Sequence, residues 1–404
     1  MQKRTIYLVG GAVRDELLGL EPKDRDFVVV GSTEEEMLAL GFSKVGADFP
    51  VFLHPDTGEE YALARRERST GPGYNDFEVE FSPDVTIEED LGRRDFTMNA
   101  IAKDIETSEY IDPYNGQNDI QFRKLTMVHE KAFLEDPVRI LRMARFTSQF
   151  PAFRVSYSTE KAARIGNIGF ATPERVTKEL EKALMGAKPS EFFDTLFSIG
   201  QTEAWFKEIF ALWGVPQPIK YHAEGCAYQH TMMVLDSAAK HNESLEVRFG
   251  CLVHDLGKAL TPKHKLPRHL GHEAAGVQPT NDLCDRLKLS NDLRQAGTLS
   301  AKFHMICHKA YEMGPKGYVN TFESFRNCVD ISEIVAKVAW HDNQGRLPYE
   351  SYNGENERFV SVLKHLKTIK LSADYSSEQI EAMSIENRKG TLHKMRLNAV
   401  KRMV

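Results

Sequence analysis

The stretch "VGGAVRDELLGLEPKDRDFVVVG" (residues 9–31) combines a glycine pair, a short helical pattern and two aspartates directly before an apolar run. The apolar residues that precede the glycines predict a strand, and "AVRDELLG" has a helical spacing that Gly19 closes. "DFVVVG" predicts a second strand. The stretch therefore predicts a strand, a glycine turn, a helix and another strand, which is the beginning of an α/β sheet domain.

Asp24 and Asp26 stand one residue apart at the start of the second predicted strand. Side chains alternate along an extended chain, so these two carboxylates are expected on the same face. Two carboxylates this close repel each other unless a cation lies between them, and hard oxygen ligands select Mg²⁺. A surface Asp-x-Asp turn is the alternative, but the glycine turn upstream and the strand that follows favour a metal site.

The chain has 404 residues, of which 41% are hydrophobic and 27% are charged. This length exceeds that of one ordinary core and predicts two to four domains. No uninterrupted apolar run reaches about 18 residues, so we expect no membrane span. Glycines and then Arg14-Asp15 interrupt the first apolar run too early for a signal peptide, which predicts a cytoplasmic protein.

The cysteines are scattered along the chain without any Cys-x-x-Cys pair. This pattern predicts neither a disulfide framework nor a thiolate zinc site. We expect reduced, mostly buried thiols at Cys226, Cys251, Cys284, Cys307 and Cys328.

The formal net charge of −6 conceals a segregation of charge along the chain. Residues 76–119 carry thirteen acidic and three basic residues, whereas residues 123–188 carry thirteen basic and seven acidic ones. A basic helical stretch is what contact with a phosphate backbone requires. An ordinary solvated helix face explains the charge equally well.

Two regimes of secondary structure follow each other along the chain. Up to about residue 127, short β-rich runs alternate with Gly, Pro and Asp, and beyond it the pattern is helical. In "TPERVTKELEKAL" we expect a helix that Thr172 caps and Pro173 begins. The helix-breaking stretch "WGVPQPIKYH" (213–222) predicts a linker between domains.

Four motifs carry a resemblance to a known family. In order, they are "GGAVRDELLG…DRDFVVVG", "RRDFTMNA" (93–100), "EDPVRILRMARF" (135–146) and "TPERVTKEL" (172–180). Their order and spacing resemble those of the class II tRNA nucleotidyltransferases, the CCA-adding enzymes of the DNA polymerase beta-like superfamily. The likeness covers about the first half of the chain, and bacterial poly(A) polymerases share much of this set.

The resemblance implies roles for three carboxylates. Nucleotidyl transfer requires a 3′-hydroxyl to attack an α-phosphate while pyrophosphate leaves, and two divalent ions can stabilise the entering and leaving oxygens. Asp24 and Asp26 would hold these Mg²⁺ ions, and Glu60 falls where the family places a third catalytic carboxylate. A surface glutamate is an equally fair interpretation of Glu60.

Other motif positions would bind the nucleotide. By the same resemblance, Gly11 and Arg14 belong to the triphosphate-binding loop, and a guanidinium can grip phosphate oxygens bidentately. Arg94 and Asp95 would contact the phosphate and sugar of the nucleotide.

The motif "EDPVRILR" would select the base. Asp136 offers an acceptor and Arg139 a rigid donor fork, which together can meet the edges of cytosine or adenine. Arg142 lies about one helical turn beyond Arg139 on the same face. In the family these positions choose CTP and then ATP without a nucleic-acid template.

The second half of the chain contains a separate group of histidines and aspartates. They occur in "YQHTMM", "CLVHDLGKAL", "LGHEAAG", "KFHMICH" and "AWHDNQGR". This order resembles the HD phosphohydrolase domain, which implies His230, His254, Asp255 and Asp342 as metal ligands. The donor set suits Ni²⁺ or another divalent transition metal, which would activate a water for attack on a phosphate ester.

Four other histidines are expected to be structural: His241, His264, His269 and His308.

Together the resemblances imply an α/β polymerase beta-like nucleotidyltransferase head (1–127) and an all-α neck and body for nucleotide selection and tRNA binding (128–212). An all-α HD domain (222–345) and a helical C-terminal tail (346–404) follow. The implied protein adds or repairs the 3′-terminal CCA of tRNA from CTP and ATP. Its HD domain would have phosphatase, 2′-nucleotidase and 2′,3′-cyclic phosphodiesterase activity.

Two other functions and the oligomeric state stay open. A poly(A) polymerase is disfavoured by the HD motifs and by the absence of a strongly basic tail. A non-catalytic RNA-binding protein is disfavoured by the complete pair Asp24 and Asp26. Monomer and homodimer are both compatible with the sequence.

Overall fold

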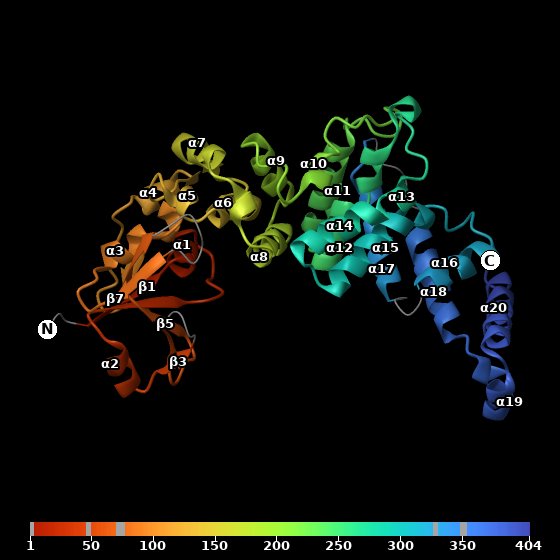
Figure 1. Ribbon diagram of the computed structural model, residues 1–404, viewed down its shortest axis with the longest axis horizontal. Coiled ribbons are helices and arrows are strands. Elements are labelled where there is room, and N and C mark those ends of the chain that lie inside the picture. Colours follow the sequence, from red (N-terminus) through yellow and green to blue (C-terminus); the bar gives the residue numbers. More distant parts are fainter. Residues whose placement is uncertain (1–3, 46–49, 70–76, 326–329, 348–353) are drawn as a thin grey trace. The chain divides into compact units, whose positions relative to one another are not determined.

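The computed structural model describes residues 4–45, 50–69, 77–325, 330–347 and 354–404 (Figure 1). The chain divides into two compact units. The N-terminal unit comprises Met1–Val176 and Asp194–Gln201, and the C-terminal unit comprises Thr177–Phe193 and Thr202–Val404.

The N-terminal unit is built on a seven-stranded mixed sheet with the order β3-β4-β5-β2-β1-β8-β9. Its strands are β1 (Thr5–Val9), β2 (Asp26–Val30), β3 (Ser43–Val45), β4 (Val51–Leu53), β5 (Glu60–Leu63), β8 (Ala102–Asp104) and β9 (Tyr110–Ile111). The central strands β2 and β5 are parallel, and the other neighbours are antiparallel. Two small sheets pair β6 (Arg65–Ser69) with β7 (Phe77–Phe81) and β10 (Lys124–Leu125) with β11 (Arg154–Val155).

Both faces of β2 are buried, which explains its continuous apolar sequence. On one face, Val28 and Val30 join Val9 in an aliphatic core. On the other face, the ring of Phe27 stacks on that of Tyr61 at 4.5 Å. Because the side-chain period of a strand is two, Asp26 shares the face of Val28 and Val30.

Helices and helical turns of the N-terminal unit accompany the sheet and continue beyond it. They are α1 (Gly11–Leu17), α2 (Glu34–Ala39), α3 (Ile87–Gly92), η1 (Thr97–Asn99), α4 (Gly116–Gln121), α5 (Ala132–Glu135), α6 (Val138–Gln149), α7 (Tyr157–Ile165) and η2 (Ile168–Phe170). The helices α8 (Pro173–Leu184) and α9 (Ser190–Ser198) contribute residues to both units.

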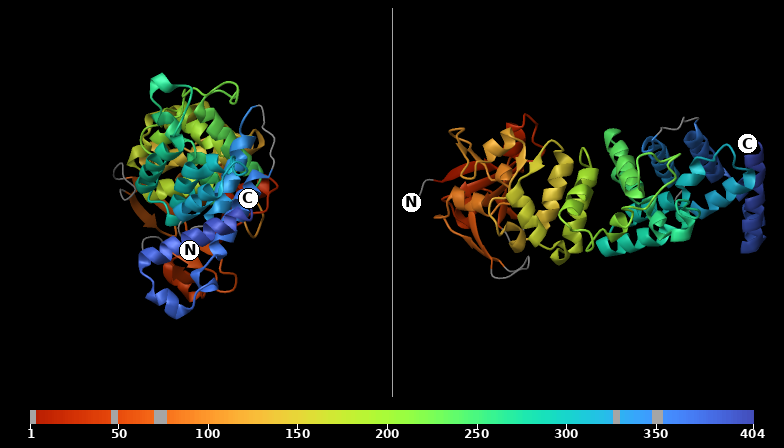
Figure 2. Two further views of the ribbon diagram at one scale, coloured as in Figure 1. Left: turned by 90° about the vertical axis from the view of Figure 1, so that its right-hand side faces the viewer. Right: turned by 90° about the horizontal axis from the view of Figure 1, so that it is seen from above.

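The C-terminal unit is helical in its described residues (Figures 1 and 2). Its first elements are α10 (Lys207–Phe210), α11 (Ala227–Lys240), α12 (Leu245–Val253), η3 (Leu256–Leu260), η4 (Lys263–Lys265), α13 (His272–Ala275) and α14 (Val277–Leu287). The remaining elements are α15 (Asn291–Cys307), α16 (Pro315–Phe325), α17 (Ile331–Gln344), α18 (Glu355–Thr368), η5 (Leu371–Ala373), α19 (Ser377–Ala382) and α20 (Ile385–Lys401).

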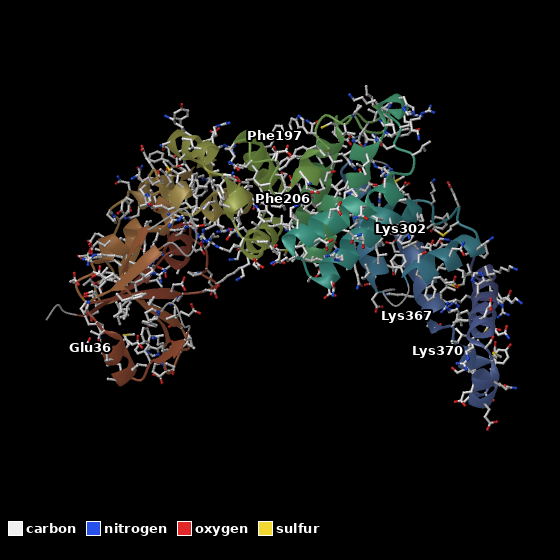
Figure 3. The ribbon with its side chains drawn as sticks, in the orientation of Figure 1. Glu36, Phe197, Phe206, Lys302, Lys367 and Lys370 are labelled. Carbon is white, nitrogen blue, oxygen red and sulfur yellow. The ribbon has the colours of Figure 1, made fainter. Side chains whose placement is uncertain are left out.

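Apolar faces hold these helices together. Val234 on α11, Val247 and Cys251 on α12 and Val338 on α17 share one buried cluster. Near α10, the ring of the fully buried Phe206 meets those of Phe192 and Phe193 edge-on (Figure 3). Burying side chains of this size supplies most of the driving force for packing such helices.

The predicted fold class is confirmed, because a mixed α/β head precedes a helical body and a helical C-terminal unit. The helix expected from Pro173 onward is α8. The segment 213–222 contains no helix, but it lies within the C-terminal unit rather than between the two units. The finer division at residues 127, 212 and 345 stays a prediction.

Two further predictions concern the state of the cysteines and the absence of membrane-spanning helices. Cys251, Cys284 and Cys307 are buried free thiols, Cys226 is partly buried, and Cys328 lies outside the described residues. Burial raises the pKa of Cys284 to about 11, which keeps this thiol protonated. In the described part of the chain, no helix combines the length and the hydropathy that crossing a membrane requires.

Candidate functional site

The glycine turn after β1 brings two motifs together. Gly10 has a φ of 69°, a left-handed conformation that favours glycine, and α1 begins at the next residue. A Cβ atom at Gly10 would lie 2.9 Å from Nη1 of Arg94. The turn therefore needs glycine for its conformation and for its close approach to the guanidinium of the "RRDFTMNA" motif.

Strand pairing places two of the predicted carboxylates side by side. In the parallel pair β2–β5, Asp26 is in register with Glu60, and on the other side Asp26 is opposite Val9 of β1. Residues in register on adjacent strands project from the same face. Asp26 and Glu60 therefore face the same side of the sheet, next to the end of β1 and the glycine turn.

Asp24 differs from the expectation in its backbone. The strand begins only at Asp26, and Asp24 lies in the bend that precedes it. Strand alternation therefore does not set the direction of its side chain. The two carboxylates still interact: desolvation raises the pKa of Asp26, Arg94 lowers it, and the negative charge of Asp24 raises it.

The carboxylates Asp24, Asp26 and Glu60 fit a hard cation. They supply only oxygen ligands, and the pKa of Asp26 is raised, first by desolvation of its carboxylate and then by the negative charge of Asp24. Among the described residues, these three do not form a group with ligand atoms all within 4.8 Å. Mutual repulsion keeps such carboxylates apart, and a divalent ion would draw them together.

A chain of hydrogen bonds joins α1 to α6. Arg14 donates from Nη1 to Oδ1 of Asn99 at 2.8 Å, and Asn99 donates from Nδ2 to Oδ1 of Asp95 at 3.1 Å. Arg142 donates from Nε to Oδ2 of Asp95 at 2.6 Å. Burial alone would raise the pKa of Asp95, but Arg142, Asn99 and Arg139 outweigh it and lower that pKa to about 2. Three predicted motifs thus share one network.

Asp90 positions the two arginines of the "RRDFTMNA" motif, a role that we had not predicted. Its fully buried carboxylate accepts from Nη2 of Arg93 at 2.7 Å and from Nη2 of Arg94 at 3.2 Å. The Nε donor of Arg94 is buried without a hydrogen-bond partner. In the sequence, the spacing of Asp90 from Arg93 (i,i+3) and from Arg94 (i,i+4) could have indicated these two ion pairs.

The proposed base-selecting residues lie on α6 and in the short segment directly before it. Arg139 and Arg142 follow each other on α6, as expected, and Arg139 donates from Nη2 to the backbone oxygen of Arg93 at 2.7 Å. Asp136 lies between α5 and α6 and forms a bidentate pair with Arg175, at 2.9 and 2.7 Å. Arg175 belongs to "TPERVTKEL", but sequence reasoning gave it no role. The pair fixes the direction in which Asp136 points.

The low pKa of Asp95 predicts a pH-dependent stability. A folded-state pKa of about 2 lies below the ordinary value of 3.8, so ionised Asp95 stabilises the protein above about pH 4 and loses this contribution as the pH falls toward 2. We expect the stability difference between wild type and Asp95→Asn to shrink by about 2 kcal/mol across this window. Urea unfolding at stepped pH measures it, with the exposed Asp56→Asn as control. A constant difference would contradict the assignment.

The histidine motifs converge inside the C-terminal unit. Side chains from α11, α13, α15 and the turn after α12 form two fully buried groups in which the ligand atoms lie within 4.8 Å of one another. They are His230–His254–Asp255 and Asp255–His272–His304. Asp342 completes the first group, because its Oδ1 lies 3.0 Å from Nε2 of His230 and 3.9 Å from Nε2 of His254. Asp255 is common to both groups.

The four histidines of these groups present the same nitrogen to the centre. Their Nδ1 atoms lie 2.7–3.3 Å from backbone oxygens of Gly345, Cys251, His269 and Ser300, in chain order. A carbonyl oxygen can only accept a hydrogen bond, so each Nδ1 carries the proton. The Nε2 atoms face the other groups of the centre: Nε2 of His230 lies 3.0 Å from Oδ1 of Asp342, and Nε2 of His272 lies 3.3 Å from Nε2 of His304. In the neutral ring each Nε2 would offer its lone pair to a metal ion.

Three ligand atoms of this centre lack hydrogen bonds. They are Nε2 of His254 and both carboxylate oxygens of Asp255, all of them buried. Buried polar atoms are normally satisfied, so a cluster of unsatisfied ones indicates a missing ligand. Imidazole nitrogens with carboxylate oxygens suit a divalent transition metal. The residues present therefore fit such an ion.

Cations balance the two aspartates of the centre. Lys258 Nζ lies 2.5 Å from Oδ2 of Asp255, and Nη2 of Arg346 lies 2.5 Å from Oδ2 of Asp342. Burial alone would raise the pKa of each aspartate, but these cations and the histidines lower both well below the usual range. His308, which we expected to be structural, donates from Nε2 to Oδ2 of Asp342 at 2.9 Å.

The predicted ligand set omitted several residues that the structure brings to the centre. His272 and His304 had been noted in their motifs but not chosen as ligands. Glu224 was missed entirely: its Oε1 lies 2.8 Å from Nδ1 of His222 and 3.1 Å from Nδ1 of His230. The glycine of "HDLGK" lets His272 approach the centre, because a Cβ at Gly257 would lie 2.0 Å from the backbone oxygen of His272.

Glu224 contacts His230, one of the predicted metal ligands, and this contact predicts an effect on metal affinity. The buried carboxylate holds the Nδ1–H of His230, so we expect Glu224→Gln to weaken Mn²⁺ binding by about tenfold. Equilibrium dialysis of the folded variant measures the affinity, and Glu312→Gln, at an exposed position, is the matched control. Equal affinities for all three proteins would show that Glu224 does not orient the ligand.

Comparisons with known proteins agree with the two sites. Residues 6–126 match the Poly A polymerase head domain, and residues 227–339 match the HD domain. The fold and the site thus define a protein with a nucleotidyltransferase head and an HD domain. The chain is 44% identical to the Multifunctional CCA protein of Paraburkholderia phymatum, covering 98% of this chain and 97% of that protein. It belongs to the family of multifunctional CCA proteins.

Further relatives extend the comparison. The Multifunctional CCA protein of Burkholderia multivorans is also 44% identical, with 98% of each chain covered. Among solved structures, the Bacillus stearothermophilus CCA-adding enzyme in complex with CTP has a TM-score of 0.70 at 24% identity, covering 99% of this chain and 90% of that chain. A complex of a CCA-adding enzyme with ATP has a TM-score of 0.64 at 19% identity, covering 98% and 86%. These structures share the fold of this chain.

Proposed function

We propose that this protein adds or repairs the 3′-terminal CCA of tRNA, using CTP and ATP without a nucleic-acid template. The observation that carries the proposal is the register of Asp26 with Glu60 beside the Gly10 turn, which the guanidinium of Arg94 approaches. The names of the full-length relatives support the same activity.

The head supplies the groups that nucleotidyl transfer needs. The 3′-hydroxyl attacks the α-phosphate, one P–O bond forms, and the bond to pyrophosphate breaks. Mg²⁺ held by Asp24, Asp26 and Glu60 would stabilise the charge on the entering and leaving oxygens. The Nε donor of Arg94, buried without a partner, and the glycine turn that its guanidinium approaches would bind the triphosphate.

Residues after the head would select the base. Asp136 and Arg139 offer an acceptor and donors to base edges, while Arg142 braces Asp95. Arg175 and the Arg93 backbone hold the first two in fixed directions, which limits the entropy lost on binding. Arg14 reaches the same network through Asn99 and would join it to the triphosphate.

Product length distinguishes this proposal from its alternatives. A tRNA that lacks CCA, offered with CTP and ATP, should gain three nucleotides and stop, whereas a long A tail would identify a poly(A) polymerase. Asp26→Asn should lower the rate by at least about a hundredfold, because the carboxylate binds the catalytic ion. Binding of tRNA should persist, and Asp56→Asn, an exposed control, should extend normally. Full extension by Asp26→Asn would contradict the metal assignment.

For the HD centre we propose metal-dependent hydrolysis of phosphate esters, with phosphatase, 2′-nucleotidase and 2′,3′-cyclic phosphodiesterase activity. Ni²⁺ or another divalent transition metal held by His230, His254, Asp255 and Asp342 would acidify a bound water. Opening a cyclic phosphate forms one P–O bond from water and breaks one to the ribose oxygen, which takes the proton that water loses. Lys258, close to Asp255, would lie beside the phosphate.

The two activities should be separable, because their ligands lie on different elements. His254→Ala should eliminate hydrolysis of a 2′,3′-cyclic nucleotide and leave CCA addition unchanged, and Asp26→Asn should do the reverse. After chelation, Ni²⁺ or Mn²⁺ should restore hydrolysis, while Mg²⁺ should restore addition. Both assays on each folded variant test this. If His254→Ala loses both activities, the HD centre is not an independent enzyme site.

A further inference from the structure

The loop of residues 259–271 is anchored at both ends in the HD centre. It begins after Lys258, whose Nζ contacts Asp255, and it ends at His272, whose Nε2 lies 3.2 Å from Oδ1 of the same aspartate. Within the loop, Thr261 and His269 are hydrogen bonded at 2.8 Å. The loop therefore forms part of the rim of the metal centre.

The loop is strongly basic and presents its charges to solvent. Lys263, Lys265 and Arg268 are all exposed, and residues 259–271 contain no acidic residue. None of the three forms an ion pair with a described residue of the chain. On a protein with a net charge of −6, this concentration of unpaired cations on one loop is a local exception.

A second loop, residues 216–222, adjoins the first at the same rim. Pro216 accepts a hydrogen bond from Nε2 of His269 at 2.9 Å, and Gln217 accepts one from Lys258 at 2.7 Å. A few residues on, the ring of His222 lies 4.9 Å from that of the ligand His230.

Between these anchors, the second loop exposes Lys220 and the half-exposed ring of Tyr221. In the first loop, Leu270 is 88% exposed. The rim thus offers cations together with an aromatic ring and an apolar side chain. This combination matches the phosphates and base faces of a single strand of nucleic acid.

We infer that this rim binds the backbone of an RNA strand and that the HD centre therefore prefers the 3′ end of such a strand to a free nucleotide. The inference rests on the proposed hydrolase activity. A mononucleotide has only its own phosphate, which Lys258 and Arg346 within the centre can match. Lys263, Lys265 and Arg268 lie outside the buried centre, where only the phosphates of preceding nucleotides would reach them.

Two substrates distinguish a strand from a nucleotide. A short single-stranded RNA that ends in a 2′,3′-cyclic phosphate is compared with 2′,3′-cyclic AMP, using the whole protein loaded with Ni²⁺. We expect the RNA to have at least about tenfold higher kcat/KM at low salt. Its log kcat/KM should fall with log salt, by about 0.7 per phosphate contact.

The variant Lys263→Ala/Lys265→Ala/Arg268→Ala should remove this advantage. Its kcat/KM for the RNA should fall about tenfold or more and its salt slope by about 2, because three phosphate contacts are lost. Hydrolysis of 2′,3′-cyclic AMP should be unchanged. The matched control removes three exposed lysines of the same unit, Lys240, Lys302 and Lys316, and should behave as wild type (Figure 3 labels Lys302).

The outcomes separate this inference from the proposed function. If neither substrate is hydrolysed, the hydrolase proposal fails. If cyclic AMP is hydrolysed but the RNA has no advantage, or if the loop variant hydrolyses both substrates like wild type, the rim does not bind RNA. Equal losses on both substrates would make the loop a support of the metal centre instead.

Discussion

A carboxylate taken out of water must be compensated by positive charge, and this constraint organises the candidate sites. In the N-terminal unit, Asp90 holds Arg93 and Arg94, while Asp95 holds Arg142. Each pair removes the freedom of a long side chain before any ligand arrives. The arginines are therefore held in fixed directions by the buried acids, and under the proposed function these acids would position the groups that bind the nucleotide.

The buried aspartates of the HD centre are also compensated by cations, but some of their polar atoms keep unused hydrogen-bonding capacity. Asp255 has Lys258 Nζ 2.5 Å from one oxygen and Nε2 of His272 3.2 Å from the other, yet neither contact has the geometry of a hydrogen bond, and Nε2 of His254 also lacks one. Asp95, by contrast, has hydrogen bonds to both oxygens. A structural carboxylate is saturated by its own protein, whereas a ligand carboxylate keeps unused lone pairs. This difference identifies a metal site more sharply than the number of nearby histidines does.

Much of this arrangement could be predicted because it depends on local sequence. The glycine turn, the strand that begins at Asp26 and the start of α8 at Pro173 all follow from neighbouring residues. Partners far apart in the chain could not be predicted in the same way, because they depend on how elements pack. Arg175 reaches Asp136 across 39 positions, and His272 joins Asp255 only because Gly257 lets two segments approach. The family motifs included these residues, but the motifs did not reveal their pairings.

The path from Arg14 through Asn99 and Asp95 to Arg142 has a consequence for how the head and α6 work together. Arg14 binds Asn99, and Asn99 shares the carboxylate of Asp95 with Arg142. Because Asn99 and Arg142 each bond one oxygen of that carboxylate, losing one bond alters the strength of the other. Under the proposed function, the residue that would bind the triphosphate and the helix that would select the base are thus joined by direct hydrogen bonds. Substitutions at Asp95 and Arg142 should for this reason be non-additive, since both belong to one network.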